Sequence, residues 1–149
     1  MMIEIAGLRV PSAFLSAINA GLNPLGTVLR PHGGVDAYGH PLMLGLAQVY
    51  LEPIALARAT LRVAIGFEAD AWYGARLPTS AGAIPDIVDF GRILCFASSS
   101  DGEPFCLDFR DDSLHPSVIC WDGDALSWRR IAPDVESFLR MFDLRLHAS

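Results

Sequence analysis

One stretch of the chain concentrates the residue types that commonly carry out chemistry. Residues 105–130, FCLDFRDDSLHPSVICWDGDALSWRR, contain two cysteines, one histidine, five aspartates and two tryptophans. Thiols, an imidazole and carboxylates could serve a nucleophilic hydrolase, a general acid–base pair or a metal site. Acidic and aromatic side chains at one edge of a domain could equally form a surface that binds another protein. The spacing of these residues has to decide between the alternatives.

The two cysteines lack the usual surroundings of a nucleophile. A reactive cysteine needs a base within reach and a cation or a helix N-terminus that stabilises its thiolate. Cys106 and Cys120 lie in predicted strands, and His115 precedes a proline in a turn. Because an unreactive cysteine behaves as a small apolar residue, buried structural thiols are the better interpretation. The odd total of three cysteines predicts no disulfide framework and fits a reducing cytosol.

The aspartates admit an acid–base interpretation that their spacing does not favour. Asp111 and Asp112 are adjacent, and Asp122 and Asp124 flank a single glycine. Glycoside hydrolysis needs two carboxyl groups on either side of a cleft at set separations. Aspartates between strands more often cap turns through their own side chains. An uncharacterised hydrolase that uses Cys or paired Asp residues is therefore the least favoured alternative.

Neither a metal nor a cofactor is expected from the motifs. His32, Asp36 and His40 fall in a loop rich in Gly and Pro, where no helix fixes them as ligands on one face. The sequence has no dinucleotide-binding glycine motif, P-loop, HExxH or CxxC pattern, and it has no lysine that could form a Schiff base. We expect solvated loop histidines, no metal and no cofactor.

The net charge of −6 is concentrated in one segment. Residues 101–124 hold seven acids and one arginine, whereas the rest of the chain holds ten acids and ten arginines and is neutral. The acids are Asp101, Glu103, Asp108, Asp111, Asp112, Asp122 and Asp124. An acidic patch attracts a basic protein surface and repels nucleic acid, so we expect no nucleic-acid partner. The alternative is that these acids simply collect in turns.

The first half of the chain gives mixed signals. Pro11 opens a helix of about nine residues in which apolar residues recur at helical spacing. The following elements are predicted as an extended piece at Thr27–Arg30, a strand at Val49–Leu51, a helix from Pro53 to about Thr60, a strand within 61–73 and a loop over 74–86. Helix and strand stay ambiguous over 44–66, because the apolar run there has no clear period.

The second half predicts strands and a closing helix. The strands are expected at Ile93–Ala97, 105–110, Ser117–Trp121 and Ser127–Ile131, with a tight turn at Asp101-Gly102. In the strand at 105–110, Phe105, Leu107 and Phe109 should face the core, so that Asp108 and Arg110 face outward or line the rim of a groove.

The closing helix is expected to begin with Pro133 in its first position. Its buried face is predicted to comprise Val135, Phe138, Leu139 and Phe142 and to continue to Leu146. These elements predict a single α+β domain over residues 1–149, with a curved antiparallel or mixed sheet, a short N-terminal helix, a middle helix and a C-terminal helix. No apolar run reaches the ~18 residues of a membrane span, and the N-terminus lacks a signal-peptide pattern, so we expect a cytoplasmic protein.

The second half also resembles the SUKH superfamily, which includes yeast regulators of cell-wall synthesis and many bacterial toxin-immunity proteins. The similarity rests on Phe96-Ala97, Asp101-Gly102, Phe105–Asp108, Pro116–Asp122 and Val135–Leu139, and on VPSAFLSAINAG near the N-terminus. The resemblance implies an α+β fold with helices at its start and end and generally no catalysis. It also implies that the protein binds another protein, such as a toxin that it neutralises.

We therefore expect a partner-binding face in which two tryptophans anchor the contact and acids steer a basic partner. The expected residues are Asp101, Glu103, Asp108, Asp111, Asp112, Trp121, Asp122, Asp124 and Trp128. Either tryptophan could instead pack in the core, and then the acids alone would carry the prediction. A regulatory or scaffold module in signalling or cell-wall assembly is the alternative to an immunity protein.

Overall fold

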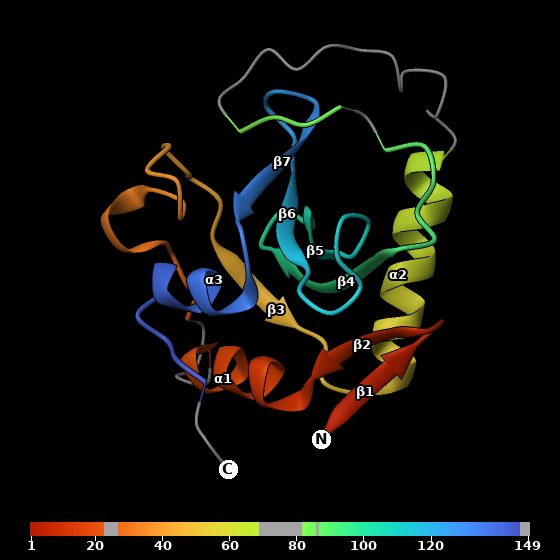
Figure 1. Ribbon diagram of the computed structural model, residues 1–149. Helices are drawn as coiled ribbons and strands as arrows, with labels where there is room; N and C mark the ends of the chain where they lie inside the picture. Colours follow the sequence, from red (N-terminus) through yellow and green to blue (C-terminus); the bar gives the residue numbers. More distant parts are fainter. Residues whose placement is uncertain (23–26, 69–81, 86, 147–149) are drawn as a thin grey trace.

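The computed structural model describes residues 1–22, 27–68, 82–85 and 87–146 of the chain. Its helices and strands confirm the predicted α+β class (Figure 1). The elements are β1 (Met2–Ile5), β2 (Leu8–Pro11), α1 (Ser12–Leu22), β3 (Leu46–Val49), α2 (Pro53–Glu68), β4 (Ile93–Ser99), β5 (Pro104–Asp108), β6 (Ser117–Asp122), β7 (Ser127–Ala132) and α3 (Val135–Met141), with a 3₁₀ turn at His32–Gly34.

The five-stranded sheet is an antiparallel meander in the order β3-β4-β5-β6-β7. The four strands predicted in the second half are confirmed, each to within one or two residues. Register shifts in three of the four strand pairs add local twist, which curves a sheet. A meander with tight turns brings alternate turns to the same end, so the β4–β5 and β6–β7 turns share one end of the sheet.

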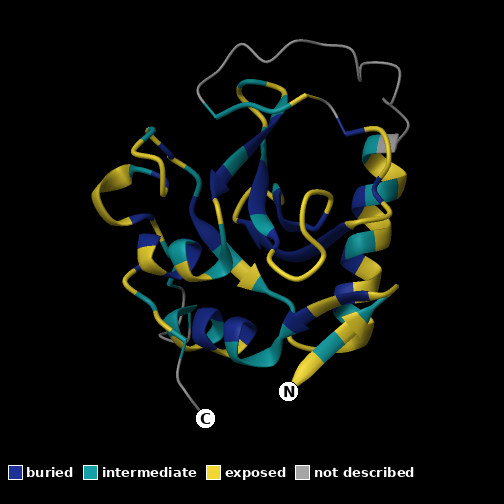
Figure 2. Cartoon of the chain, in the orientation of Figure 1, coloured by how far each residue is buried: buried dark blue, intermediate teal, exposed yellow. Residues whose placement is uncertain are grey.

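Helices cover both faces of this sheet (Figure 1). α1 and α3 pack on one face, around a core that includes Phe14, Phe96 and Phe138. α2 covers the other face, where Val63 packs in a second core with Trp128. The Thr60 hydroxyl accepts a hydrogen bond from the backbone N–H of Cys95 at 3.0 Å and so joins α2 to β4. The central strands are buried along their whole length as a result (Figure 2).

The predicted alternation along this stretch is right, but Asp108 is less exposed than expected. Phe105, Leu107 and Phe109 lie in the core, at 0%, 0% and 1% exposure. Asp108 was expected to face outward or to line the rim of a groove; it lines a small hollow and is only 3% exposed, because the guanidinium groups of Arg110 and Arg130 lie against its carboxylate. Arg110, just beyond the strand, is exposed as expected.

An N-terminal hairpin precedes α1, and the sequence analysis missed it. β1 and β2 pair through a two-residue turn in which Ala6 and Gly7 have φ angles of 51° and 83°. Two positive φ angles define the type I′ turn, whose second residue is commonly glycine. Pro11 therefore ends a strand, and α1 begins one residue later and runs for 11 residues.

The ambiguous middle of the chain is mainly helical. α2 continues for 16 residues, so the strand expected from Leu61 onward is wrong as far as Glu68, and the rest of that stretch lies outside the described residues. The strand expected at Val49–Leu51 begins earlier, as β3. The extended piece at Thr27–Arg30 is confirmed by a bridge between Leu29 and Leu46. Most of the loop expected over 74–86 lies outside the described residues.

The start of α3 also differs from the prediction. Asp134 is the N-cap and accepts a hydrogen bond from the Ser137 backbone N–H at 2.7 Å, so Pro133 precedes the helix instead of occupying its first position. This bond lowers the pKa of the Asp134 carboxyl despite the opposing effect of burial. α3 ends at Met141, and Leu146 lies beyond it on a non-helical segment.

A buried ion pair fixes the loop between α1 and β3. Asp36 accepts a hydrogen bond from the Arg129 guanidinium at 2.7 Å, and their side chains are 0% and 9% exposed. The same carboxylate accepts the backbone N–H groups of Tyr38 and His40 at 2.8 and 3.0 Å. Asp36 is thus a structural residue of this loop. The sequence alone could not show this role, because the cationic partner Arg129 lies 93 residues away on β7.

Candidate functional site

Two hairpin turns at one end of the sheet carry four of the predicted site residues. In the β4–β5 turn, Gly102 adopts a φ of +85° and the Ser99 hydroxyl accepts the backbone N–H of Glu103 at 3.1 Å. In the β6–β7 turn, Asp122 accepts the backbone N–H groups of Asp124 and Ala125 at 3.0 and 3.1 Å. These bonds fix the shape of each turn locally.

A side chain joins the two turns to each other. The Glu103 carboxylate accepts a hydrogen bond from the Gly123 backbone N–H at 2.9 Å, across 20 residues of sequence. The structure therefore brings together Asp101, Glu103, Asp122 and Asp124, which we call the acidic end. Asp101 and Asp124 are exposed, whereas Glu103 and Asp122 are half-buried. Within the described part of the chain, no salt bridge neutralises any of the four.

The other three predicted acids lie at the opposite end, around the β5–β6 turn, and their charges are paired. Asp108 binds Arg110 through two bonds of 2.9 and 2.8 Å, and Arg130 lies 4.0 Å away. Asp111 contacts Arg130 at 3.5 Å, and Asp112 contacts the His115 ring at 3.3 Å. With Tyr38 they line a pocket of about 190 Å³ in which cations balance much of the negative charge.

The pKa values at this opposite end follow from the pairing. Burial by itself would raise the pKa of Asp108, but hydrogen bonds from Arg110 and the charges of both arginines lower it. Backbone N–H donors from Leu114 and His115 lower the pKa of Asp112. Both carboxylates are therefore held in place by turn and ion-pair contacts, and they do not form the cleft-flanking pair that glycoside hydrolysis requires.

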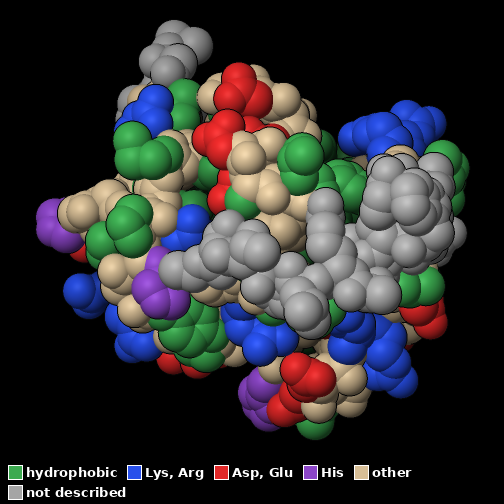
Figure 3. Space-filling model, turned by 90° about the horizontal axis from the view of Figure 1, so that it is seen from above, with side chains coloured by type: hydrophobic (Ala, Val, Ile, Leu, Met, Phe, Trp, Pro, Cys, Tyr) green, Lys and Arg blue, Asp and Glu red, His purple; other side chains and the backbone are tan. Residues whose placement is uncertain are grey.

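The acidic segment seen in the sequence is thus two separate groups. β5 is five residues long, which puts about 17 Å between its ends. The Debye length at physiological ionic strength is only about 8 Å, so the two groups act independently on a charged partner. On the face shown in Figure 3, acidic side chains lie in separate places and do not form one continuous patch.

The two tryptophans have different environments. Trp128 is 1% exposed in the core beneath α2, which corrects its prediction as a surface anchor. Trp121 is half-buried, and its ring lies 5.6 Å from that of Trp128 and 4.8 Å from that of Phe67, measured between centroids. Trp121 therefore remains near the surface at the acidic end, since it directly precedes Asp122.

The cysteines have the environment of structural thiols. Cys95, Cys106 and Cys120 are all buried and unpaired. Burial raises the pKa of the Cys106 and Cys120 thiols, which disfavours the thiolate that a nucleophile needs. His115 is exposed on a turn beyond the far ends of the strands that carry these two cysteines, so it is not placed to act as their base.

Groups suited to a metal ion are not assembled in the described residues, where no three His, Cys, Asp or Glu side chains come together. His32 contacts Asp143 at 3.3 Å and is exposed, whereas Asp36 is committed to Arg129. No helix in the described ranges is long and apolar enough to cross a membrane.

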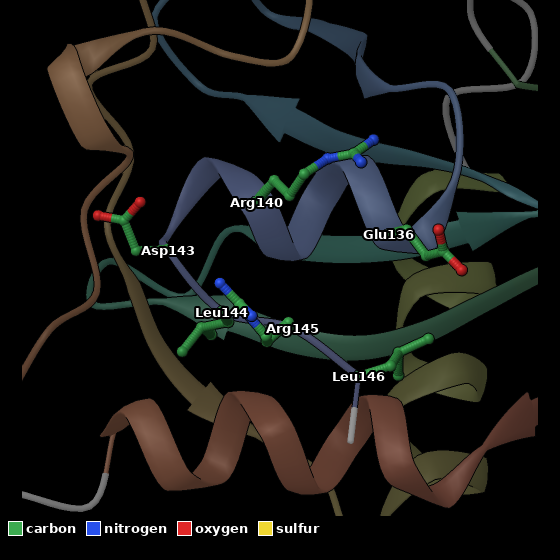
Figure 4. Close-up of a pocket in the computed structure, with 6 residues that line it drawn as sticks. All are labelled: Glu136, Arg140, Asp143, Leu144, Arg145 and Leu146. Carbon is green, nitrogen blue, oxygen red and sulfur yellow. The ribbon is translucent and has the colours of Figure 1, made fainter. Parts of the chain in front are cut away.

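A further hollow lies beside α3 and does not coincide with either acidic group. It has a volume of about 630 Å³. Figure 4 shows its residues on α3 and on the segment that follows it toward α1, and they are Glu136, Arg140, Asp143, Leu144, Arg145 and Leu146. Two acids and two arginines balance each other, and the Arg140 and Glu136 side chains in Figure 4 do not converge on a common point. Its lining therefore supports no particular chemistry.

The fold is that of an α+β domain built on an antiparallel meander with helices on both faces. A family model described as SMI1 / KNR4 family (SUKH-1) matches residues 14–141, and the chain belongs to this family. The match confirms the resemblance and extends it across the middle of the chain, where the sequence signals were ambiguous. Comparisons with curated proteins and with solved structures gave no match.

Proposed function

We propose that this protein is a non-enzymatic protein-binding domain that neutralises a bacterial toxin, and that its acidic end docks a basic surface of that toxin. One observation carries the proposal: Asp101, Glu103, Asp122 and Asp124 share one end of the sheet without a salt bridge among the described residues. No described residue neutralises these four charges, whereas those of Asp108, Asp111 and Asp112 are paired.

Family membership also supports a protein-binding function. The SUKH superfamily includes toxin-immunity proteins and regulators that act by binding other proteins, and it generally lacks catalysis. The buried cysteines and the turn-capping aspartates agree with a binding role, because neither set has the surroundings of a catalytic group. The partner is a protein and not nucleic acid, since four like negative charges would repel a phosphate backbone.

The test uses the product of the gene next to this one as the candidate toxin, with its association rate measured against salt concentration. Asp101→Arg with Asp124→Arg reverses two exposed charges whose side chains make no hydrogen bond to the described residues, so the fold should be retained. We expect association at low salt to slow by about tenfold or more, and by much less at high salt.

The matched control is Glu4→Arg with Asp111→Arg, which makes the same change of charge at two other exposed positions. This pair should leave the rate within about twofold of the wild type, since Asp111 lies beyond the opposite end of β5 and Glu4 lies on the separate β1–β2 hairpin. Equal effects of the two double variants would remove the acidic end from the interface. Failure of the neighbouring toxin domain to bind at all would favour the regulatory or scaffold alternative.

A further inference from the structure

A groove opens between α2 and the turn end of the β4–β5 hairpin. Its volume is about 250 Å³. α2 contributes Arg62, Val63 and Phe67 to its lining, and the hairpin contributes Ser98, Gly102 and Pro104. Gly102 lies between Asp101 and Glu103 in the chain, so the groove opens directly beside the acidic end.

The walls of the groove are mainly apolar and firmly supported. The Phe67 ring packs at 4.8 Å from Trp121 and 4.9 Å from Trp128, between ring centroids. Val63 and Pro104 are buried. Aromatic rings packed in this way have little freedom to rearrange, so this wall is formed before any partner arrives.

The charges around the groove are asymmetric. The four acids of the acidic end stand on the hairpin side, and the exposed Arg62 stands on the α2 side. A lone lysine placed inside would lose its water against the apolar walls, whereas an apolar side chain placed inside could leave neighbouring cations in contact with the acids. The arrangement therefore matches an apolar residue flanked by basic ones.

We propose that this groove is an anchor site that takes a large apolar side chain from a basic segment of the partner protein, with the acidic end holding the flanking arginines or lysines. The inference rests on the proposed function and adds the chemistry of the contact. Protein interfaces commonly have this form, in which one buried apolar anchor lies within a polar rim. Arg62 lies opposite the acids and can donate hydrogen bonds to backbone carbonyls of the same segment.

α2 carries a second apolar surface that serves as an internal comparison. Ile54, Leu61 and Ile65 are 67%, 59% and 66% exposed and lie on the outer side of the helix. None of these three residues is acidic or lines one of the hollows described above. We therefore expect a basic segment to bind this stripe more weakly than the groove. Binding there would be hydrophobic association without the charge complementarity that the groove offers.

The probe is the peptide acetyl-Arg-Lys-Leu-Phe-Lys-Arg-amide, compared with a version in which serine replaces both Leu and Phe. Amide resonances of the isotope-labelled full chain are followed by NMR at peptide concentrations up to about 1 mM, where weak contacts are measurable. We expect the apolar peptide to shift the amides of Val63, Phe67, Ser98 and Gly102 in a saturable way. The serine peptide should shift only the amides of the acidic end.

Two variants of α2 provide a matched test of the location. Arg62→Trp places an indole at the rim of the groove, and Arg58→Trp makes the same change on the outer side of the helix, also at an exposed arginine. Both remove one positive charge, so they differ only in position. We expect Arg62→Trp to weaken binding of the apolar peptide on the order of tenfold and Arg58→Trp to leave it unchanged.

Three results would overturn the groove as an anchor site. These are equal responses to both peptides, shifts confined to the acidic end, and shifts centred on the Ile54, Leu61 and Ile65 stripe. In each case the acidic end could still dock the toxin domain, because that is measured separately through the charge-reversal variants. Loss of toxin binding with an intact groove response would instead contradict the proposed function.

Discussion

Replacing Asp36 by alanine should destabilise the protein far more than replacing any other loop aspartate. The Asp36 side chain is 0% exposed and accepts three hydrogen bonds, from Arg129 at 2.7 Å, from Tyr38 at 2.8 Å and from His40 at 3.0 Å. Removal of the carboxylate leaves a guanidinium that is 9% exposed without its counter-charge. It also leaves two backbone N–H groups in the loop without an acceptor.

The size of the effect follows from these contacts. Breaking a buried ion pair by removing one partner costs about 3–5 kcal/mol. Arg129 keeps two acceptors, since its guanidinium also donates to the carbonyls of Pro41 at 2.7 Å and His40 at 3.3 Å, which favours the lower part of that range. We therefore expect Asp36→Ala to lower the free energy of unfolding by about 3–4 kcal/mol. That is a large fraction of the total stability of a typical domain.

Urea denaturation followed by circular dichroism measures this loss. A decrease of about 3 kcal/mol should lower the midpoint by roughly 2 M at a typical urea m-value. Asp101→Ala is the control, because that exposed carboxylate makes no hydrogen bond or salt bridge to described residues and should change stability by less than about 0.5 kcal/mol.

A double-mutant cycle separates the ion pair from the packing. Asp36→Leu with Arg129→Met removes both charges and should be more stable than Asp36→Leu alone, since no unpaired buried cation remains. If the two single effects simply add, or if Asp36→Ala costs less than about 1 kcal/mol, the pair does not stabilise the loop as described.

Three further outcomes are expected. Because the folded pKa of Asp108 is lowered, its stabilising effect is full above the unfolded pKa of about 3.9 and is lost as pH falls through the folded value. Asp108→Asn should thus cost about 1–3 kcal/mol in urea denaturation near pH 7 and progressively less as the pH falls below about 3.9, and a cost that does not change with pH would contradict this. Cys95, Cys106 and Cys120 should resist alkylation in the native protein and react fully after unfolding, as counted by mass spectrometry, whereas rapid native labelling would disprove their burial. Gly7→Val should lower the free energy of unfolding by about 1 kcal/mol or more, because its φ is +83°, and so lower the melting temperature; an unchanged melting temperature would argue against the type I′ turn.

The pattern of the second half specified its elements closely. The alternation of Phe105, Leu107 and Phe109, the Asp-Gly turn and the apolar runs on either side predicted the strands of the meander. Such signals are local, since side chains alternate along a strand and a glycine in a turn supplies a positive φ. The N-terminal hairpin carried a comparable local signal and could have been predicted. Ala6-Gly7 lies between two short runs in which apolar and charged residues alternate.

Other features depend on neighbours that are distant in sequence. α2 was ambiguous because helix and strand both suit a short apolar run, and its identity follows from packing across β4. The same packing covers the second face of the sheet and buries Trp128, whereas Asp108 is covered by Arg110 and Arg130. The groove lined by Arg62 and Phe67 could not be foreseen, since one wall comes from this helix and the other from a hairpin.

The distribution of charge separates most clearly what the sequence determined from what the tertiary structure determined. The sequence by itself established that the net charge of −6 resides in residues 101–124, because composition does not depend on folding. Only the tertiary structure decided which of these acids are paired with arginines. The antiparallel meander sends the β4–β5 and β6–β7 turns to one end and the β5–β6 turn to the other, and it places Arg110 and Arg130 beside the acids of that second end. Since a salt bridge depends on distance through space and not along the chain, one acidic segment becomes a neutralised group and a group that forms no salt bridge with the described residues.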